Sequence, residues 1–356
     1  MKRWRKPAIW LVTSLLVISA GVGSYFAVPR LLAGWRCALW PELALPGLEA
    51  GRDYIFVAMG ACNTAVAIDT ERHAVVAAAR LGGRFPHGIA ISPDGQEFYA
   101  ANQRSDTVSV VALPQFTLVA TIPAGNFPTD LVPSVEGGRM FLTNFKGGSV
   151  QVLDRFSRSV VREVASPRAT HFAEAPDGKR LYVTNWDNRL TVLDGGGETV
   201  IKVIPLPGKP NHATVSRDSR RIYVTLYGDS ALAVVDAGRL EVIATIPVGL
   251  HPMAPAVTPD GRWVYVSNID SGTVSVVDTE RLTVVGEIRT GGTPQHPVMD
   301  RLGRTLWVSN PEREAVQVLD LASRRVVREI YTGPEPQQMA PRYLGAHRQA
   351  DTSGPR

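Results

Sequence analysis

The chain has 356 residues, of which 44% are hydrophobic and 20% charged, and this composition excludes a disordered chain and one wholly embedded in a membrane. Its net charge is +5, but residues 1–36 contain six basic residues and no acidic one. Removing those six from the total of 38 leaves 32 basic against 33 acidic residues, so the rest of the chain is close to neutral. A nucleic-acid-binding surface needs clustered lysines and arginines, and we therefore expect no nucleic-acid partner.

An uncharged, mostly apolar run occupies residues 8–28, and as a helix it would cover roughly 30 Å, the thickness of a bilayer core. Four basic residues precede it, so the positive-inside rule predicts a cytoplasmic segment 1–7, a transmembrane signal anchor 8–28 and an exported remainder. The alternative is a cleaved signal peptide, with Ile18-Ser19-Ala20 as its small-residue site. We expect a single pass through the bacterial inner membrane, with the body of the protein in the periplasm.

The rest of the chain is organised by a repeat. An aspartate ends a β-rich run in six places, 40 to 43 residues apart once Ala112 is counted at the position where the column is interrupted. The six are Asp69, Asp154, Asp194, Asp236, Asp278 and Asp320. We interpret this column as turn-closing and structural, since aspartate side chains bond to the local backbone in tight turns.

Two further columns follow the same period. The first is aromatic and is expected to fill the space between repeat units; its members are Phe56, Tyr99, Phe141, Tyr182, Tyr223, Tyr265 and Trp307. The second is asparagine, at Asn102, Asn144, Asn185, Asn268 and Asn310. The columns define seven units between residues 53 and 345, after a linker at 29–52 and before a polar tail at 346–356 that we expect to be disordered.

Each unit reads as four short strands with Gly- and Pro-rich turns, for example Trp263–Asn268 and Thr273–Asp278. Seven such units predict an all-β fold, a seven-bladed β-propeller with four-stranded antiparallel blades, preceded by one N-terminal transmembrane helix. The first unit begins with its second strand, at residues 54–59. We therefore expect a C-terminal strand near residues 339–344 to complete that blade and close the ring.

Four segments repeat an aromatic-Val-Thr/Ser pattern, mostly ending in Asn: Tyr182–Asn185, Tyr223–Thr225, Tyr265–Asn268 and Trp307–Asn310. They resemble the YVTN repeat of the bacterial YncE-like family of seven-bladed propellers, over about 290 residues. That resemblance implies the fold more than an activity, since relatives include surface-layer and periplasmic proteins, lactonase-like enzymes and cytochrome d1-like haem domains. The d1 haem domains have eight blades, whereas seven units are counted here.

Five of the seven histidines lie in loops that lead into innermost strands: His87, His171, His212, His251 and His296. The repeat turns a linear spacing of about 40 residues into convergence around one axis, so we expect the five imidazoles to line a circular rim at the channel mouth. Imidazole ligates transition metals, transfers protons and donates hydrogen bonds to anions. His171, His212 and His296 share one repeat position and are candidate metal ligands, although no local motif such as His-x-x-x-His supports a metal site; the alternative is that these histidines only cap strands.

Other loop residues are expected on the same face and are candidates for ligand binding: Arg104, Lys146, Trp186, Asp187, Tyr227, Asp229 and Asp270. Trp186 is the most suggestive, because an exposed tryptophan in a loop often marks a contact surface. A catalytic dyad of His212 with Asp187 or Asp229 is one hypothesis. No nucleophile motif such as Gly-x-Ser-x-Gly or Ser-x-x-Lys occurs in the sequence.

The two cysteines, Cys37 and Cys62, are too few for a four-cysteine zinc site or an all-cysteine iron–sulfur cluster. In an oxidising exterior two interpretations stay open, a disulfide that ties the histidine face to the N-terminal anchor, or two free thiols.

The sequence favours a membrane-anchored binding or scaffold module that takes a small ligand or a periplasmic protein at its channel mouth. The alternative is a cofactor-handling protein, holding a haem d1-type tetrapyrrole or a transition metal, or a lactonase-like hydrolase that uses the same face. The sequence requires no cofactor and leaves catalysis open, with an enzyme the less favoured reading.

Overall fold

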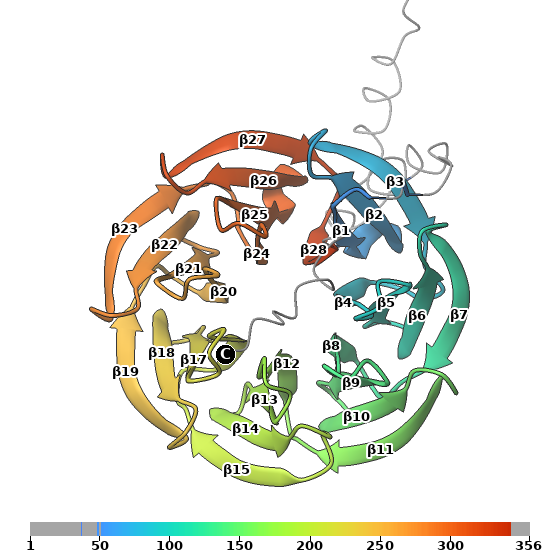
Figure 1. The fold of residues 1–356 in the computed structure, drawn as a ribbon, viewed down its shortest axis with the longest axis horizontal. Coiled ribbons are helices and arrows are strands. Elements are labelled where there is room, and N and C mark those ends of the chain that lie inside the picture. Colours follow the sequence, from blue (N-terminus) through green and yellow to red (C-terminus); the bar gives the residue numbers. More distant parts are fainter. Residues whose placement is uncertain (1–36, 38–47, 50, 343–356) are drawn as a thin grey trace, which may run out of the picture.

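The computed structural model describes residues 37, 48–49 and 51–342. They form seven four-stranded antiparallel sheets arranged as blades around a central channel (Figure 1). The expected transmembrane helix at 8–28, most of the linker and the tail at 346–356 lie outside the described residues. Within the described part of the chain, no helix has the length and apolar character needed to cross a bilayer.

Blade 1 contains β28 (Pro336–Arg342), β1 (Tyr54–Met59), β2 (Thr64–Asp69) and β3 (Ala74–Arg80). Blades 2 and 3 contain β4 (Pro86–Ile91), β5 (Glu97–Asn102), β6 (Thr107–Ala112), β7 (Thr117–Pro123), β8 (Pro128–Pro133), β9 (Arg139–Asn144), β10 (Ser149–Asp154) and β11 (Ser159–Ala165).

Blades 4 and 5 contain β12 (Ala169–Glu174), β13 (Arg180–Asn185), β14 (Arg189–Asp194), β15 (Val200–Pro205), β16 (Pro210–Val215), β17 (Arg221–Leu226), β18 (Ala231–Asp236) and β19 (Glu241–Pro247). Blades 6 and 7 contain β20 (Pro252–Val257), β21 (Trp263–Asn268), β22 (Thr273–Asp278), β23 (Thr283–Arg289), β24 (Pro297–Met299), β25 (Thr305–Asn310), β26 (Ala315–Asp320) and β27 (Arg325–Tyr331). Two single-turn 3-10 helices, η1 (Gly60–Cys62) and η2 (Pro311–Arg313), follow β1 and β25.

The ring closes as the sequence predicts. The C-terminal strand β28 pairs antiparallel with β1, so that Phe56 lies opposite Ala340 and Tyr54 opposite Arg342 (Figure 1). The strand begins at Pro336, three residues before the expected start. Closure removes the unpaired edge that an incomplete first blade would leave at the channel.

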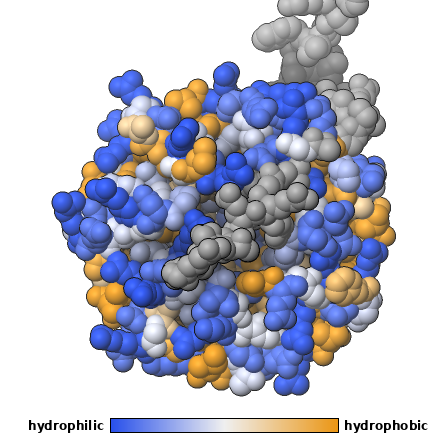
Figure 2. Space-filling view, viewed as in Figure 1, coloured by the Kyte–Doolittle hydropathy of each residue, from blue (hydrophilic) through white to orange (hydrophobic). Residues whose placement is uncertain are grey.

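The aromatic column forms the core, and all seven of its side chains are at most 4% exposed. Burial of one such side chain contributes about 1.5–3 kcal/mol to folding. The asparagine column is also structural: Asn102 donates to Ser109, and Asn268 donates to Ser275, across the second and third strands of a blade. The outer surface carries hydrophilic residues over most of the face in Figure 2, with hydrophobic ones in small groups, several at the perimeter.

The aspartate column closes turns, as expected. The Asp278 carboxylate accepts hydrogen bonds from the backbone N–H groups of Glu280 and Arg281, and Asp236 does the same for Gly238 and Arg239. These backbone donors hold the pKa of both carboxyls below its ordinary value.

Candidate functional site

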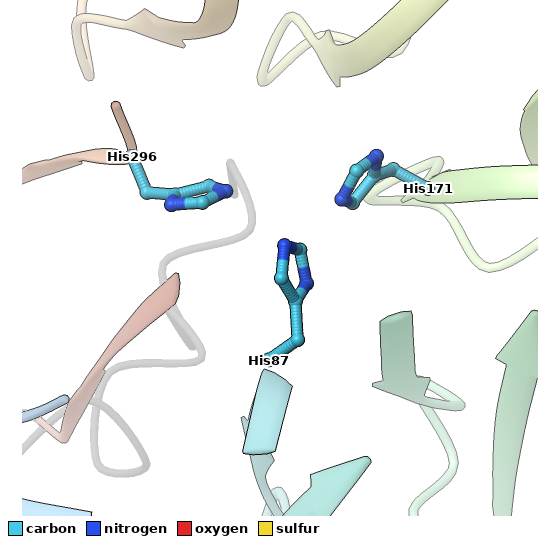
Figure 3. Close-up of side chains that lie close together, drawn as sticks. All are labelled: His87, His171 and His296. Atoms are coloured by element: carbon cyan, nitrogen blue, oxygen red, sulfur yellow. The ribbon is translucent and has the colours of Figure 1, made fainter. Parts of the chain in front are cut away.

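Four histidines converge at the axis of the ring. His87 comes from β4, His171 from β12 and His212 from β16, and His296 immediately precedes β24. Figure 3 shows the side chains of His87, His171 and His296 pointing toward one another, and one ring nitrogen of each lies within 4.8 Å of the other two. We call these four residues the histidine cluster.

The rings of the cluster pack directly against one another. His171 and His212 stack with ring centroids 3.2 Å apart, and His212 meets His296 edge-on at 5.0 Å. His87 lies 5.7 Å from His171 and 5.6 Å from His296. None of the four is more than 9% exposed, so the cluster forms a buried floor to the channel mouth.

In β4, β12 and β16 a β-bulge aims the histidine side chains inward, whereas His296 lies in the loop before β24. In β12 the pairing with β13 runs from Ala169 opposite Asn185 directly to Phe172 opposite Val183, which leaves Thr170 and His171 out of the ladder. The bulge bends the strand and turns the unpaired residues toward the channel. The same irregularity occurs in β4 and β16, at the positions of His87 and His212.

A Thr/Ser column satisfies the backbone groups that the bulges release. The Thr184 hydroxyl accepts from the His171 N–H at 3.1 Å, and Thr225 accepts from the His212 N–H at 3.0 Å. Ser309 does so for His296. The Thr or Ser at the third position of the YVTN pattern therefore stabilises the backbone of the residue whose side chain faces the channel.

Two imidazoles are oriented by hydrogen bonds to main-chain carbonyls. His87 Nδ1 lies 3.0 Å from the carbonyl oxygen of Thr129, and His171 Nδ1 lies 3.0 Å from that of Asn211. A carbonyl only accepts, so each Nδ1 carries the hydrogen and donates it, and each Nε2 keeps its lone pair. The Nε2 atom of His171 is buried and has no hydrogen-bond partner among the described residues.

The ring nitrogens of the other two histidines, His212 and His296, have fewer hydrogen-bond partners among the described residues. The Nε2 atom of His212 and both ring nitrogens of His296 are buried without a hydrogen-bond partner in the described chain. Burial lowers the pKa of His296, and the Gln337 backbone opposes this effect only in part, without forming a well-aligned hydrogen bond to either ring nitrogen. A buried polar atom without a partner costs about 1–3 kcal/mol, so the cluster is not arranged for stability.

Burial keeps all four imidazoles neutral. Desolvation lowers the pKa of His87 to about 4, against a small opposing effect of the Thr129 carbonyl. Burial, reinforced by repulsion between the neighbouring rings, lowers the pKa of His171 and His212 well below the ordinary value. Burial does the same for His296. Neutral imidazole is the form that binds metal ions.

His251 does not join the cluster, and the expectation of a rim of five imidazoles is wrong in this respect. His251 has a φ of 51° and lies just before β20, outside the bulge. Its side chain is 40% exposed. Its Nδ1 lies 2.6 Å from a carboxylate oxygen of Asp270, and its ring stacks on Tyr227 at 4.5 Å. The His–Asp pair of this face is thus His251 with Asp270.

The dyads considered for His212 are not formed. The carboxylate of Asp187 pairs with Arg189 at 2.6 Å. Asp229 is exposed, and its side chain lies beside Gly208. Arg104 stacks on Phe85, 3.9 Å from the ring centroid.

The cluster has one neighbour that the sequence analysis missed. Asp130 in β8 occupies the same bulge position as His171, is 1% exposed and accepts a hydrogen bond from the Phe172 N–H at 3.0 Å. Burial raises the pKa of its carboxyl to about 6. Aligning the innermost strands at the histidine position would have found this residue, because Asp130 stands there in the third unit.

An arc of aromatic side chains stands above the cluster on one side of the mouth. Phe127 and Phe145 lie 6.2 Å apart, Phe145 meets Trp186 edge-on at 5.9 Å, and Trp186 stacks with Tyr227 at 5.9 Å. We call these four residues the aromatic arc. Together with His87, His171 and Met253 they line a cavity of about 310 Å³.

Cys37 and Cys62 are joined in the structure by a disulfide, with their Cα atoms 5.3 Å apart. Cys62 ends η1, the loop that follows β1, and the Gly60 N–H in that loop donates to the carbonyl of Glu335, just before β28. The disulfide therefore holds residue 37 at the histidine-bearing face of blade 1.

These features define a class: a closed seven-bladed β-propeller with a neutral histidine cluster in its channel and an aromatic wall above it. The model of the cytochrome D1 heme domain matches residues 180–301. The protein YncE of Salmonella typhi is 24% identical over 149 residues, which are 40% of this chain and 42% of that protein. The match thus spans about two fifths of the length of this relative.

Two solved structures show the same fold. Dihydro-heme d1 dehydrogenase NirN has a TM-score of 0.65 and 21% identity, over 81% of this chain and 66% of that one. A Bacteroides uniformis protein with a proposed 6-phosphogluconolactonase assignment has a TM-score of 0.69 and 17% identity, over 82% of this chain and 99% of its own. The chain is thus a seven-bladed β-propeller whose sequence is similar to YncE and, over residues 180–301, to the cytochrome D1 heme domain.

Proposed function

We propose that the protein binds one first-row transition-metal ion in its channel, through the Nε2 atoms of His87 and His171 and a ring nitrogen of His296. The observation that carries the proposal is the convergence of three such atoms within 4.8 Å in a buried site. The main-chain bonds at Nδ1 of His87 and His171 support it, since a second-shell acceptor at one ring nitrogen directs the other toward a metal.

The donor set favours zinc, copper, nickel or iron, because imidazole suits these metals and no carboxylate stands among the three ligands. Metal–nitrogen bonds of about 2.0–2.1 Å in a tetrahedral site place ligand atoms about 3.3 Å apart. The three rings therefore need to close by about 1 Å on binding. His212 is not among the three converging ligands, because its ring is stacked on that of His171.

A haem d1-type tetrapyrrole does not fit the residues present. Such a group needs an imidazole nitrogen facing a flat cleft as wide as the macrocycle. Here the Nε2 atoms of His171 and His212 are buried against the other rings, whose centroids lie 3.2–6.4 Å apart. A single ion is small enough for the space between the rings, whereas a macrocycle would have to displace them.

The proposal places the metal-binding propeller in the periplasm, tethered by the N-terminal segment to the inner membrane. The charge of that segment and the Cys37–Cys62 disulfide support an exported location, since disulfides persist in oxidising compartments. The same mouth is open to a small ligand or a periplasmic partner protein, with Trp186 37% exposed at its edge.

The test is metal titration of the full-length chain, purified in mild detergent and stripped with a chelator. Zn²⁺ and Co²⁺ should bind with one ion per chain, and bound Co²⁺ should show a visible absorption spectrum. His171→Asn should weaken binding more than about 100-fold, whereas the rim variant His251→Asn should leave it unchanged. Less than a tenth of an ion per chain, or equal binding by the two variants, would overturn the proposal.

The hydrolase alternative is tested in the same preparation. Hydrolysis of a lactone that disappears in His251→Asn, with metal content unchanged, would assign catalysis to the His251–Asp270 pair instead of the cluster.

A further inference from the structure

The aromatic arc has a common structural origin. Phe145, Trp186 and Tyr227 each stand directly after the second strand of a blade, on three successive blades. Their N–H groups donate to the carbonyls of Phe127, Arg168 and Lys209, the residues that precede the innermost strands. The repeat therefore places the three rings at equivalent positions of successive blades, along one side of the channel mouth.

The other side of the mouth carries Phe85, the counterpart of Phe127 in blade 2, but no aromatic residue follows the second strand of the blades there. The positions equivalent to Phe145 hold Gly60 in blade 1, Gln103 in blade 2 and Pro311 in blade 7. The cavity accordingly lies off the axis, against blades 3 to 6, with His87 and His171 in its floor. At about 310 Å³ it has the size of a site for a small molecule with one or two rings, and a folded partner could not enter it.

Two cations stand over this wall. The Lys146 ammonium lies 4.4 Å from the ring centroid of Phe127, and the Arg168 guanidinium lies 5.1 Å from that of Phe145. Both side chains are exposed, and neither belongs to an ion pair among the residues the structure describes. Their charges are therefore free to attract an anion at the edge of an apolar cavity.

From these three features we propose that the channel mouth binds a small planar aromatic carboxylate, stacked on Phe145 and Trp186 with its anionic group toward Arg168 and Lys146. The inference rests on the proposed function in one respect, since the ligand would lie directly above the metal ion. The aromatic wall and its cations are present whether or not a metal binds.

Two properties of the ligand follow from the geometry. Its ring must be flat, because offset stacking or edge-on contact with the arc contributes beyond burial of area alone. Its charge must be negative, because Lys146 and Arg168 flank the cavity, while the acids Asp187 and Asp270 of this face pair with Arg189 and His251.

The experiment compares four probes by isothermal titration calorimetry, with the full-length protein with and without Zn²⁺. 2-Naphthoate is both aromatic and anionic, 2-naphthamide is its neutral counterpart, cyclohexanecarboxylate is anionic but not flat, and a short peptide ending in tryptophan represents a protein partner. We expect saturable one-to-one binding of 2-naphthoate and about tenfold weaker binding of the amide and of the cyclohexane acid.

Variants separate the two components of recognition. Arg168→Gln should weaken 2-naphthoate binding about five- to tenfold and leave 2-naphthamide unchanged, whereas Phe145→Leu should weaken both. Arg220→Gln is the matched control, because Arg220 lies in the turn between β16 and β17 and is 84% exposed. Trp186→Leu replaces Phe145→Leu as the variant that tests stacking if the latter lowers the melting temperature, because Trp186 is 37% exposed.

The outcomes distinguish this inference from the metal proposal. If 2-naphthoate binds no better than cyclohexanecarboxylate, or if the peptide binds more tightly than either, the aromatic-carboxylate site is wrong even where Zn²⁺ binds. If 2-naphthoate binds while His171→Asn and the wild type take up equally little Zn²⁺, the arc is confirmed and the metal proposal fails.

Discussion

Acid should destabilise the metal-free protein through the histidine cluster, and His87 allows the effect to be worked out. Its pKa is about 4 in the folded protein and 6.5 when unfolded, because burial penalises the imidazolium. Between these values the unfolded chain binds more protons than the folded one. Stability is therefore complete above pH 6.5 and falls as the pH decreases toward 4.

The magnitude at pH 5 is about 2 kcal/mol for His87 alone, rising to about 3 kcal/mol below pH 4. The other three rings of the cluster act in the same direction, since burial also lowers their pKa. Because all four imidazoles resist protonation in the folded state, we expect the metal-free protein to lose stability steeply as the pH falls from 6.5 toward 5.

The variant His87→Asn isolates the contribution of one ring, because its amide can still donate to the Thr129 carbonyl. Urea unfolding followed by tryptophan fluorescence should show that wild type loses about 2 kcal/mol more than the variant between pH 7.5 and 5. His251→Asn is the control for an exposed imidazole and should behave as wild type. An equal loss in wild type and His87→Asn would refute the assignment of a buried, neutral ring.

Three further predictions concern residues around the channel. Asp130→Asn should raise the free energy of unfolding by about 2 kcal/mol at pH 7.5 and by nothing at pH 4, because the wild-type carboxyl has a pKa of about 6 and is charged only above it; urea unfolding at the two pH values checks this. Cys62→Ser should lower the free energy of unfolding by about 3 kcal/mol, since the disulfide closes a 25-residue loop, and dithiothreitol should have the same effect on wild type but none on the variant. Gly88→Ala should cost about 1–3 kcal/mol, measured by urea unfolding, because its Cβ would lie 2.5 Å from the Thr129 carbonyl oxygen; an unchanged midpoint would contradict the close packing of β4 against β8.

Most of the fold could be predicted from the sequence repeat. Turn-closing aspartates such as Asp278, buried aromatics such as Tyr223 and the missing strand of the first unit each have a local physical cause, so periodicity alone places them. The first residue of the closing strand β28 was less well predicted. The strand begins at Pro336 because pairing with β1 starts where the Glu335 carbonyl accepts a hydrogen bond from the Gly60 N–H.

The site was only partly predictable, because its geometry depends on bulges. The sequence placed five histidines near the mouth but could not show that a bulge turns His171 into the channel, while His251, one residue before β20, stays on the rim. Asp130 was overlooked because it is an acid in a column of histidines, although aligning the innermost strands places it at the position of His171. Cross-blade contacts such as His171 with Asn211, 40 residues apart, exist only after the ring closes.

The balance of energies favours a ligand at the cluster. Four buried imidazoles leave at least four ring nitrogens without partners, each costing about 1–3 kcal/mol, and they make the protein sensitive to acid. The bulge position of His171 and His212 is occupied by Gly88 in blade 2 and by Ala254 in blade 6, so the fold does not require an imidazole there. A metal ion would convert these unsatisfied lone pairs into bonds and would oppose protonation at the same atoms. Stability of the metal-loaded protein should therefore change less between pH 7.5 and 5.5 than that of the metal-free protein, which links the chemistry of the site to the fold that presents it.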